Sequence, residues 1–493
     1  MRKRTVSNKR NKNKKFIGGN MKKERSGIQF GIIVSSRNFF PMELAKKGRE
    51  AILEKMKEMG FGYIILSPTE TPLGVVETYQ DAKKCAELFA KHREEIDGII
   101  IVLPNFGDEA AVTEAIVRSG LRVPVLVQAC DDEKDKLDLS HRRDSFCGKL
   151  SVCNNLYQNR IPFTDTTYHT CSIDSREFTL DVENFAGICK VVRGLKNLRV
   201  GAIGARPSAF RTVRYSEKLL QEAGITVETT DLSVILALAE EKMKDSRVRD
   251  VMESIRLYGN MAFEVSEEKL RKQAGFFLAV QDWLEENDCQ ASAIQCWDSL
   301  EKNYGIASCL AMSMMGEMGM PSACEMDIMG AVSMAALNLA SGKPSGYLDW
   351  NNGFADNRDR CMMIHCANYP KSFLGMEPEI GNLDILSLAL GEENCFGACK
   401  GVIVPGPFTF AKVSTDDFEG RIKAYVGEGE FVHEDISTPG GPGVVEIKGM
   451  QKLMKYICQN GFEHHVAMNR SHTAGILKEA FEKYMGWEVY HHE

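Results

Sequence analysis

IQFGIIVSSRNFFPMELAKKGREAILEKMKEMG, residues 28–60, joins the pattern of a buried strand to the pattern of an amphipathic helix. Residues 28–36 are rich in Ile and Val and predict a strand. Residues 42–60 repeat apolar side chains at helical spacing and end at Gly60, which predicts a helix that ends there. The stretch opens an alternation of strands and helices.

This alternation continues to about residue 130 and begins again near residue 178. Further strand patterns lie at residues 63–67, 98–104 and 124–129, with helical patterns between them at 79–96 and 108–120. In the second series, strand patterns lie at 199–205 and 226–233, and a helix leads into a strand within 282–297. Strands of Ile and Val that alternate with helices indicate parallel sheets covered on both faces. The predicted fold class is α/β.

Residues 395–450 differ from the rest of the chain, because they are rich in Gly and Pro and contain short β runs. This composition predicts a small antiparallel β-barrel. A last helical pattern covers residues 472–486. Ligands of doubly wound sheets bind at the carboxyl ends of the strands, so candidate site residues are expected in the loops that follow strands.

The composition is that of a globular protein, since 44% of the 493 residues are apolar and 26% are charged. A chain of this length is too long for one core, and two to four domains are expected. No apolar run approaches the ~20 residues of a membrane span, so we expect no membrane partner. Fifteen cysteines without a C-x-x-C pair predict reduced thiols and a cytoplasmic protein, rather than a disulfide frame or a zinc cluster.

The first twenty residues carry eight Lys or Arg and no acid. We expect residues 1–26 to form a basic disordered arm, and a nucleic-acid-binding arm is one interpretation of it. A secretory signal is disfavoured because no apolar segment follows. We favour a mis-assigned start, because FIGGNM can be encoded with a GGAGG ribosome-binding sequence just before the codon for Met21. Without these eight charges the net charge falls from −7 to −15, and an acidic body argues against a nucleic-acid partner.

Four stretches carry residues suited to metal-assisted chemistry. They are PSACEMD with Glu325, YLDWNNG with Asp349, CMMIHCANYPKS with His365, and GFEHHVAMNRSH with His464 and His465. Two carboxylates and a histidine suit a divalent ion such as Mn²⁺ or Mg²⁺. Such an ion can hold two adjacent oxygens of a sugar and stabilise an enediolate. A carboxylate beside it can take a proton from the carbon next to a carbonyl.

Each acid also has a purely structural interpretation. Ser322 and Glu325 fit the capping box S-x-x-E at the start of an apolar helix. Asp327 suits the positive end of the same helix. Asp349 ends a predicted strand just before Asn-Asn-Gly, where Asp is a common turn former. From the pattern alone, the structural and the metal-binding interpretations both stay open.

The histidines are equally open to interpretation. His365 lies in an apolar strand and fits a core histidine with satisfied hydrogen bonds. His464 and His465 are adjacent, so on a strand their side chains would point apart and at most one is expected to be a ligand.

Three arginines, Arg206, Arg211 and Arg214, surround a predicted strand-to-helix turn. They fit a site for a phosphate or carboxylate, or salt bridges to another subunit. The preceding GAIGARP lacks the pattern G-x-G-x-x-G, which argues against dinucleotide binding.

Seven stretches in one order resemble the L-fucose/L-arabinose isomerase family: QCWDSLEKNYG, PSACEMDIMGAVSMAALNLASG, YLDWNN, HCANYPKSF, GPFTFAKVSTDD, AYVGEGEF and GFEHHVAMN. The resemblance extends from about Gly31 to the end of the chain and is strongest from residue 290 onward. It implies two Rossmann-like doubly wound α/β domains and a C-terminal domain with a small antiparallel β-barrel. We place these domains at residues 27–172, 173–350 and 351–493. It also implies a homo-oligomer, a hexamer or trimer, with active sites at subunit boundaries.

The resemblance also assigns roles to residues by motif. It implies that Glu325 and Asp349 are the catalytic acids and that both bind the metal ion together with His465, for which His464 is the competitor. The implied ion is Mn²⁺, with Mg²⁺ or Co²⁺ as alternatives. The residues that the resemblance places near the sugar are Arg37, Gln295, Trp297, His365 and Asn469. His365 also resembles an additional histidine ligand of the arabinose branch.

The resemblance thus predicts a divalent-metal-dependent aldose–ketose isomerase that acts on an open-chain, L-fucose- or D-arabinose-like sugar through an enediol. An isomerase of an anionic sugar such as sulfoquinovose is an alternative, because Arg37 and the three arginines of residues 206–214 would suit a sulfonate. A non-catalytic sugar-binding regulatory protein is a rival from another class, but it would not need both Glu325 and Asp349. A metal-dependent aldolase or lyase would need a dedicated phosphate cradle.

Overall fold

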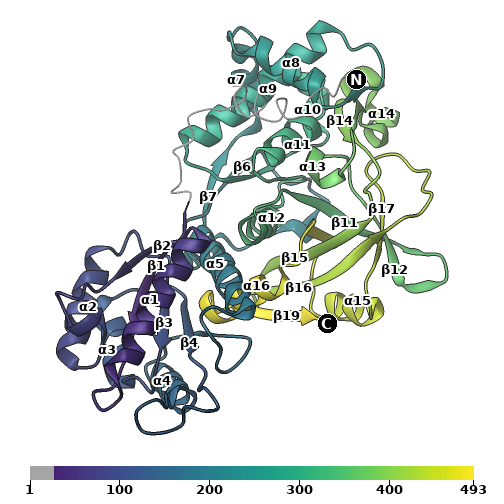
Figure 1. Cartoon of the computed structure of the whole chain (residues 1–493). Helices are drawn as coiled ribbons and strands as arrows, with labels where there is room; N and C mark the ends of the chain where they lie inside the picture. Colours follow the sequence, from purple (N-terminus) through teal and green to yellow (C-terminus); the bar gives the residue numbers. More distant parts are fainter. Residues whose placement is uncertain (1–26) are drawn as a thin grey trace, which may run out of the picture. The chain divides into compact units, whose positions relative to one another are not determined.

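The computed structural model describes residues 27–493 (Figure 1), and the predicted basic arm at residues 1–26 lies outside the described residues. The described chain divides into two compact units. The N-terminal unit comprises residues 27–193 and 479–486, and the C-terminal unit comprises residues 194–478 and 487–493. Within residues 27–493, no helix combines the length and the apolar character needed to cross a membrane.

The N-terminal unit is built on a five-stranded parallel sheet of order β2-β1-β3-β4-β5. Its strands are β1 (Gln29–Val34), β2 (Gly62–Ile65), β3 (Gly98–Leu103), β4 (Val125–Ala129) and β5 (Thr164–Asp165). Its helices are α1 (Met42–Met59), α2 (Tyr79–Lys91), α3 (Glu109–Ser119), α4 (Ser145–Gln158) and most of α5 (Arg176–Lys196), with short turns η2 (Pro72–Gly74) and η5 (Ala480–Tyr484).

Both faces of this sheet are covered, because successive side chains of each strand point to opposite faces. On one face Ile32 and Ile100 pack with residues of α1 and α5 such as Ile52 and Phe185. On the other face Ile33, Ile99 and Ile101 pack with residues of α2, α3 and α4. The predicted parallel sheet with helices on both faces is therefore confirmed for this unit.

The C-terminal unit contains a second parallel sheet, of order β10-β9-β6-β7. Its strands are β6 (Arg199–Ile203), β7 (Thr226–Thr230), β9 (Ala291–Ile294) and β10 (Ser322–Ala323). Associated helices are η3 (Arg211–Val213), α6 (Glu217–Glu222), α7 (Leu232–Lys242), α8 (Val248–Tyr258), α9 (Glu267–Glu286), α10 (Ser299–Tyr304), α11 (Cys309–Glu317) and α12 (Ile328–Ser341).

An antiparallel-rich sheet of order β15-β18-β11-β12-β17-β16-β19 follows in the same unit. Its strands are β11 (Ser345–Phe354), β12 (Asn357–Ile364), β15 (Gly406–Asp416), β16 (Arg421–Val432), β17 (Gly443–Glu446), β18 (His465–Asn469) and β19 (Glu488–His492). Strand β15 pairs with β16 as well as with β18. The antiparallel strands agree with the prediction, and the closed barrel stays a prediction.

Smaller elements complete the C-terminal unit. A three-stranded sheet has the order β14-β13-β8, with β8 (Asn260–Met261), β13 (Glu379–Asn382) and β14 (Phe396–Lys400). The remaining helices are α13 (Lys371–Leu374), α14 (Asp384–Leu390), η4 (Glu392–Asn394), α15 (Met450–Gln459) and α16 (Ala474–Glu479). The predicted domain boundaries stay predictions, although the predicted boundary at residue 350 lies inside β11.

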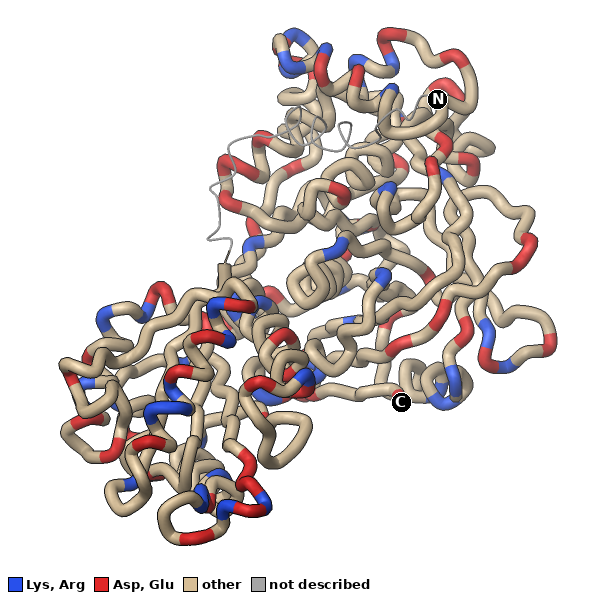
Figure 2. The backbone as a smooth tube through the Cα atoms, viewed as in Figure 1, with Lys and Arg blue, Asp and Glu red and all other residues tan. Residues whose placement is uncertain are grey.

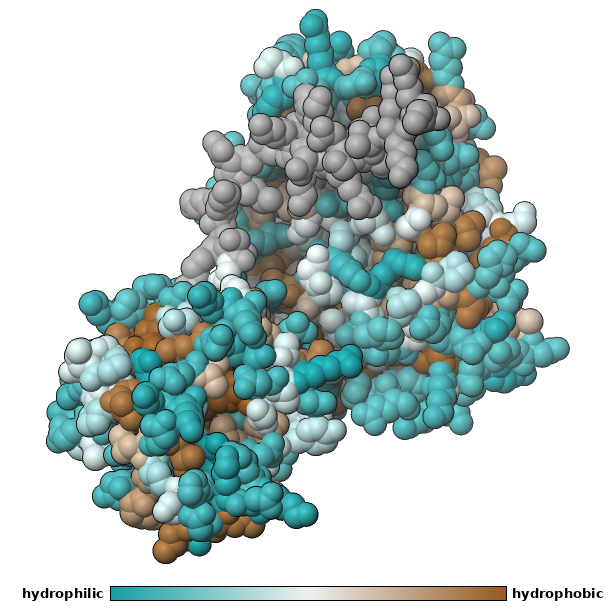
Figure 3. Space-filling model, viewed as in Figure 1, coloured by the Kyte–Doolittle hydropathy of each residue, from teal (hydrophilic) through white to brown (hydrophobic). Residues whose placement is uncertain are grey.

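The surfaces carry mixed charge. Acidic and basic residues are interspersed along both units in Figure 2, and hydrophilic side chains predominate on the faces visible in Figure 3.

Candidate active site

Four chain segments meet at one end of the antiparallel-rich sheet. Asp349 of β11 is paired with Ile364 on one side and with His465 of β18 on the other. His365 follows Ile364 directly at the end of β12. Glu325 lies in the turn between β10 and α12. Strand register therefore brings the predicted acids and histidines of unconnected motifs together.

The turn that carries Glu325 is left-handed, with φ of 52° at Glu325 and 57° at Met326. Helix α12 begins only at Ile328, and Asp327 is its N-cap, because its carboxylate accepts the Gly330 N–H at 2.8 Å. Glu325 is therefore free of the helix end.

The capping-box interpretation of Ser322 and Glu325 is wrong. Ser322 lies in strand β10, and its hydroxyl accepts a hydrogen bond from Ser292 at 2.8 Å. The sequence pattern S-x-x-E is present, but the strand extends through Ala323 and the left-handed turn delays the helix. This leaves the carboxylate of Glu325 available for chemistry.

The acid and imidazole groups form one compact cluster. Glu325 Oε2 lies 3.6 Å from His365 Nε2 and 3.9 Å from His465 Nε2. Asp349 Oδ1 lies 3.4 Å from His465 Nε2. Candidate ligand atoms of Glu325, His365 and His465 lie within 4.8 Å of one another, and so do those of Asp349, His464 and His465. His465 belongs to both groups and joins them.

Two buried oxygens of this cluster accept no hydrogen bond from residues 27–493: Glu325 Oε2 and Asp349 Oδ1. The other Glu325 oxygen, Oε1, accepts the indole N–H of Trp297 at 3.0 Å. Burial alone would raise the pKa of Glu325, but the positive charge of His365 and the hydrogen bond from Trp297 lower it below its ordinary value. A buried carboxylate oxygen without a donor is costly unless a cation meets it. The set of two carboxylates and an imidazole therefore fits a divalent ion.

Asp327 orients His465. Its Oδ2 atom lies 3.1 Å from His465 Nδ1, so Nδ1–H donates to the carboxylate and Nε2 faces Glu325 and Asp349. Carboxylate–histidine pairs of this kind fix the tautomer and orientation of metal-binding imidazoles. This geometry favours His465 over His464 as a ligand.

The strand pattern predicted that the side chains of His464 and His465 point apart, and this prediction is wrong. The centroids of the two rings are 4.2 Å apart, and His464 Nε2 lies 3.9 Å from Asp349 Oδ1. The reason is that β18 begins only at His465, so the two residues do not share strand geometry. The His464 side chain is 45% exposed, which places it at the rim of the cluster.

Asp327 is itself held by a buried network that the sequence did not reveal. Its Oδ2 atom also accepts the Tyr347 hydroxyl and Lys412 Nζ, the latter at 3.0 Å. Burial alone would raise the pKa of Asp327, but the Lys412 charge and the hydrogen bonds hold it far below its usual range. The one sequence signal was a lysine within the apolar run FTFAKVS, since a fully buried lysine needs a carboxylate partner.

The charge on His365 makes the stability of the metal-free protein depend on pH. Burial lowers the pKa of His365, but the nearby charges of Asp349 and Glu325 outweigh it and raise this pKa to about 9. Between the ordinary value of about 6.5 and 9, the folded state binds more protons than the unfolded state. The free energy of unfolding should therefore fall as pH rises, by about 2 kcal/mol from about pH 7 to about pH 9.5. Urea unfolding measured across this pH range tests the prediction. An equal fall in the free energy of unfolding in His365→Gln would contradict it.

Aromatic side chains border the cluster. Trp297, a predicted sugar contact, donates to Glu325, and its ring centroid lies 5.3 Å from that of Phe210. Phe210 also lies 5.9 Å from the His464 ring and 6.1 Å from the His465 ring. Phe210 was not predicted as a site residue, because no motif singles it out among the arginines of its loop. It brings the loop that carries Arg206, Arg211 and Arg214 to the edge of the cluster.

Gln295 links that loop to strand β9. Its side-chain oxygen accepts the Ala205 N–H at 2.9 Å, and its amide donates to the Ser299 hydroxyl at 3.0 Å. Its predicted sugar contact stays a prediction, and its hydrogen bonds show that it also positions the loop.

The remaining two predicted sugar contacts are Asn469 and Arg37. Asn469 is at the opposite end of β18 from His465, and its amide donates to Leu337 and Ser341. Arg37 belongs to the N-terminal unit, where its guanidinium pairs with Glu109 and lies 4.3 Å from the centre of the Phe106 ring. Both roles stay predictions from the resemblance.

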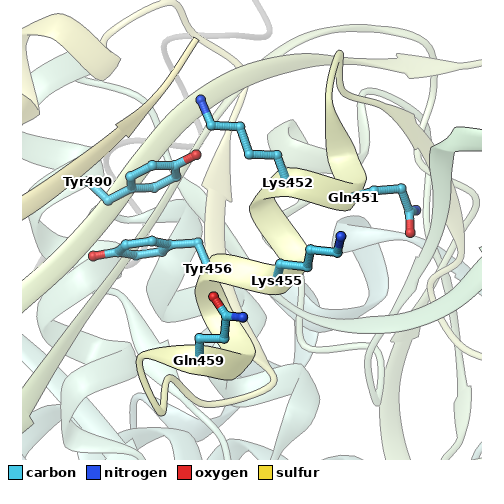
Figure 4. A pocket seen from close by; sticks show the side chains of 6 residues that line it. All are labelled: Gln451, Lys452, Lys455, Tyr456, Gln459 and Tyr490. Atoms are coloured by element: carbon cyan, nitrogen blue, oxygen red, sulfur yellow. The ribbon is translucent and has the colours of Figure 1, made fainter.

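A cavity of about 440 Å³ lies elsewhere on the C-terminal unit (Figure 4). The rings of Tyr456 and Tyr490 stack within it at 3.9 Å between centroids. Gln451, Lys452, Lys455 and Gln459 complete its lining. It contains no acid and no histidine, so it does not offer the chemistry of the cluster.

Two family models match the chain at its two ends. The model described as "Fucose/sulfoquinovose isomerase, N-terminal domain" matches residues 31–196. The model described as "L-fucose isomerase, C-terminal domain" matches residues 363–492, which include His365, His464 and His465. The two matches do not overlap, and the N-terminal-domain match precedes the C-terminal-domain match along the chain.

Curated relatives agree with these matches. A sulfoquinovose isomerase of Alkalicoccus urumqiensis is 24% identical over 78% of this chain and 83% of its own length. A sulfoquinovose isomerase of Priestia aryabhattai is 25% identical over 67% of this chain and 71% of its own length. A D-allose-bound periplasmic solute-binding protein of Actinobacillus succinogenes is 12% identical, covering 64% of this chain and 92% of its own, with a TM-score of 0.16. The chain belongs to the L-fucose isomerase-like family of aldose–ketose isomerases.

Proposed function

We propose that this isomerase acts on an anionic, sulfonate-bearing aldose of the sulfoquinovose type, with a divalent ion held by Glu325, Asp349 and His465. The observation that carries the substrate class is the Phe210 loop. Phe210 contacts the imidazoles of His464 and His465, and Arg211 and Arg214 of the same loop are exposed. No carboxylate of residues 27–493 pairs with Arg206, Arg211 or Arg214, so these guanidinium groups are available for an anionic substrate.

The residues of the cluster suit a proton transfer between C1 and C2 of an open-chain aldose. Glu325 stays ionised because its pKa is lowered, and Trp297 holds one of its oxygens while the other faces the cluster. Asp349 is a quarter exposed, so its carboxylate can meet a substrate. We infer that one acid removes the C2 proton and that the other assists delivery to C1. The bound ion would hold the two adjacent sugar oxygens and stabilise the negative charge that develops on them.

The names of the relatives support the anionic substrate, since both are sulfoquinovose isomerases. A neutral L-fucose-like sugar is the second candidate, because the C-terminal family model is that of L-fucose isomerase. The native ion is proposed to be Mn²⁺. We also propose that the protein is a homo-oligomer with active sites at subunit boundaries and that it is cytoplasmic. A regulatory role without catalysis is disfavoured by the family of isomerases to which the chain belongs.

A substrate screen separates the two candidates. Purified, Mn²⁺-loaded protein is incubated with sulfoquinovose, L-fucose, D-arabinose and L-arabinose, and the ketose is detected by NMR. We expect conversion of sulfoquinovose with the highest kcat/KM. Efficient conversion of a neutral sugar with none of sulfoquinovose would contradict the anionic substrate and support the second candidate.

Neutralising the loop arginines should weaken binding of the anionic sugar selectively. In Arg211→Gln/Arg214→Gln, the KM for sulfoquinovose should rise about 10-fold to 100-fold, because a hydrogen bond to a charged group contributes about 1.5–3 kcal/mol. Exchange of the C2 proton in a neutral aldose should not change. Arg249→Gln is the matched control, since Arg249 is an exposed arginine of α8 in the same unit. Equal effects on charged and neutral sugars would show that the arginines act only on structure.

A further inference from the structure

A group of buried thiols lies directly against Glu325. Cys296 and Cys324 follow the neighbouring parallel strands β9 and β10, whose pairing runs through Ala293 and Ala323. The Sγ atoms of Cys296 and Cys324 and a carboxylate oxygen of Glu325 lie within 4.8 Å of one another. Glu325 thus faces the candidate cation cluster, formed with Asp349, His365, His464 and His465, on one side and two sulfur atoms on another.

The thiols are tied together and shielded from solvent. The side-chain amide of Asn368 donates a hydrogen bond to the Cys324 sulfur at 3.3 Å. Cys296 accepts the backbone N–H of Glu325 at 3.4 Å. Cys296 is 3% exposed and Cys324 is 0% exposed. These contacts hold both sulfur atoms in fixed positions beside the carboxylate.

This donor set differs in kind from that of the cation cluster. Two sulfurs and one carboxylate suit soft or borderline ions with a filled d shell, whereas oxygen-rich sets suit Mn²⁺ and Mg²⁺. Metal–sulfur bonds of about 2.3 Å in a tetrahedral site place the sulfurs roughly 4 Å apart, within the 4.8 Å that the three ligand atoms span. Buried cysteines usually serve only packing, but here they share a carboxylate with the cation cluster.

We propose that Cys296, Cys324 and Glu325 form a second ion site, selective for thiophilic cations such as Cd²⁺ and Zn²⁺. When the ion binds, each thiol releases its proton to solvent and coordinates as a thiolate. Glu325 belongs to both sites, so the two ions compete for it and a thiophilic ion inhibits the enzyme. The existence of this second site does not depend on the proposed function, whereas the competition between the two ions rests on it.

Cadmium is the probe, because cadmium bound to thiolates has a charge-transfer absorption that cadmium bound to oxygen lacks. The full chain is used as Cys147→Ser/Cys458→Ser, which removes its two exposed thiols. Cd²⁺ is added to the metal-stripped protein and the absorption is recorded. We expect a saturable absorption that is lost in Cys296→Ser and in Cys324→Ser. Cys289→Ser, a buried thiol that precedes β9 in the same unit, should keep it.

The second measurement is inhibition. Raising the Mn²⁺ concentration tenfold should raise the Cd²⁺ concentration for half-inhibition about tenfold, as mass action requires for ions that compete. If the serine variants fail to fold, X-ray absorption at the cadmium edge of the wild-type complex counts the sulfur ligands instead, and two are expected. Oxygen-only coordination, or charge transfer that persists in both serine variants, would overturn the thiol site. Charge transfer in a protein without isomerase activity would contradict the proposed function and leave the thiol site supported.

Discussion

Glu325→Gln and Asp349→Asn are each expected to lower kcat by at least about 10³-fold, because positioned acids and bases contribute about 10²–10⁴ to a proton transfer and both carboxylates also meet the ion. Glu325 Oε2 and Asp349 Oδ1 have no hydrogen-bond donor among the described residues and lie within 4 Å of His465 Nε2. Steady-state kinetics with the best substrate of the screen, at saturating Mn²⁺, measure the loss.

The matched control for these variants is Glu301→Gln. Glu301 is a buried carboxylate of α10 in the same unit, and burial raises its pKa to about 7. Its replacement removes an acid without touching the cluster, so kcat should stay within about twofold of the wild type. Near-normal turnover of Glu325→Gln or Asp349→Asn, with Mn²⁺ still bound, would refute the assignment of these acids.

Asp327→Asn is expected to have two separable effects. The neutral amide no longer strengthens His465 as a ligand, and Mn²⁺ affinity should fall about 10-fold to 100-fold, as for other partners of metal-binding histidines. The change also removes the nearer carboxylate partner of the buried Lys412 and leaves Glu463, 4.0 Å away, as its remaining acidic partner, which should lower the free energy of unfolding by about 3–5 kcal/mol. Mn²⁺ titration followed by electron paramagnetic resonance and urea unfolding measure the two losses.

A second substitution separates these effects. Asp327→Asn/Lys412→Met also removes the buried ammonium group, so stability should recover while Mn²⁺ affinity stays low. Tyr347→Phe removes only one donor to Asp327 and should cost about 1 kcal/mol of stability with little change in Mn²⁺ affinity. Recovery of Mn²⁺ affinity in the double variant would mean that Asp327 acts through stability alone and does not position His465.

The parallel sheets were predictable because their signal is local. Strands such as β3, with the sequence GIIIVL, are buried on both faces and therefore read as continuous apolar runs. The helix that ends at Gly60 was equally clear, since Gly60 adopts φ of 72° and ends α1. Whether the antiparallel strands close into a barrel, and where domains divide, depends on pairings between distant residues that no local pattern specifies.

The candidate site was predictable only where motifs carried it. Glu325, Asp349 and His465 stand in motifs of the family, and the strands bring them together. The capping box failed because the pattern of Ser322 and Glu325 says nothing about where β10 ends. Asp327 and Lys412 meet across 85 positions of sequence, so the buried pair that orients His465 could not be read from either stretch alone.

The most direct test of the central claim is exchange of the C2 proton of sulfoquinovose in D₂O, followed by NMR with metal-stripped protein and after addition of Mn²⁺. We predict deuterium at C1 or C2 of the sugars and formation of the ketose only when Mn²⁺ is present, and neither in Glu325→Gln. Exchange at an unchanged rate in the metal-stripped protein, or in Glu325→Gln, would contradict an isomerase that depends on a divalent ion and on this carboxylate.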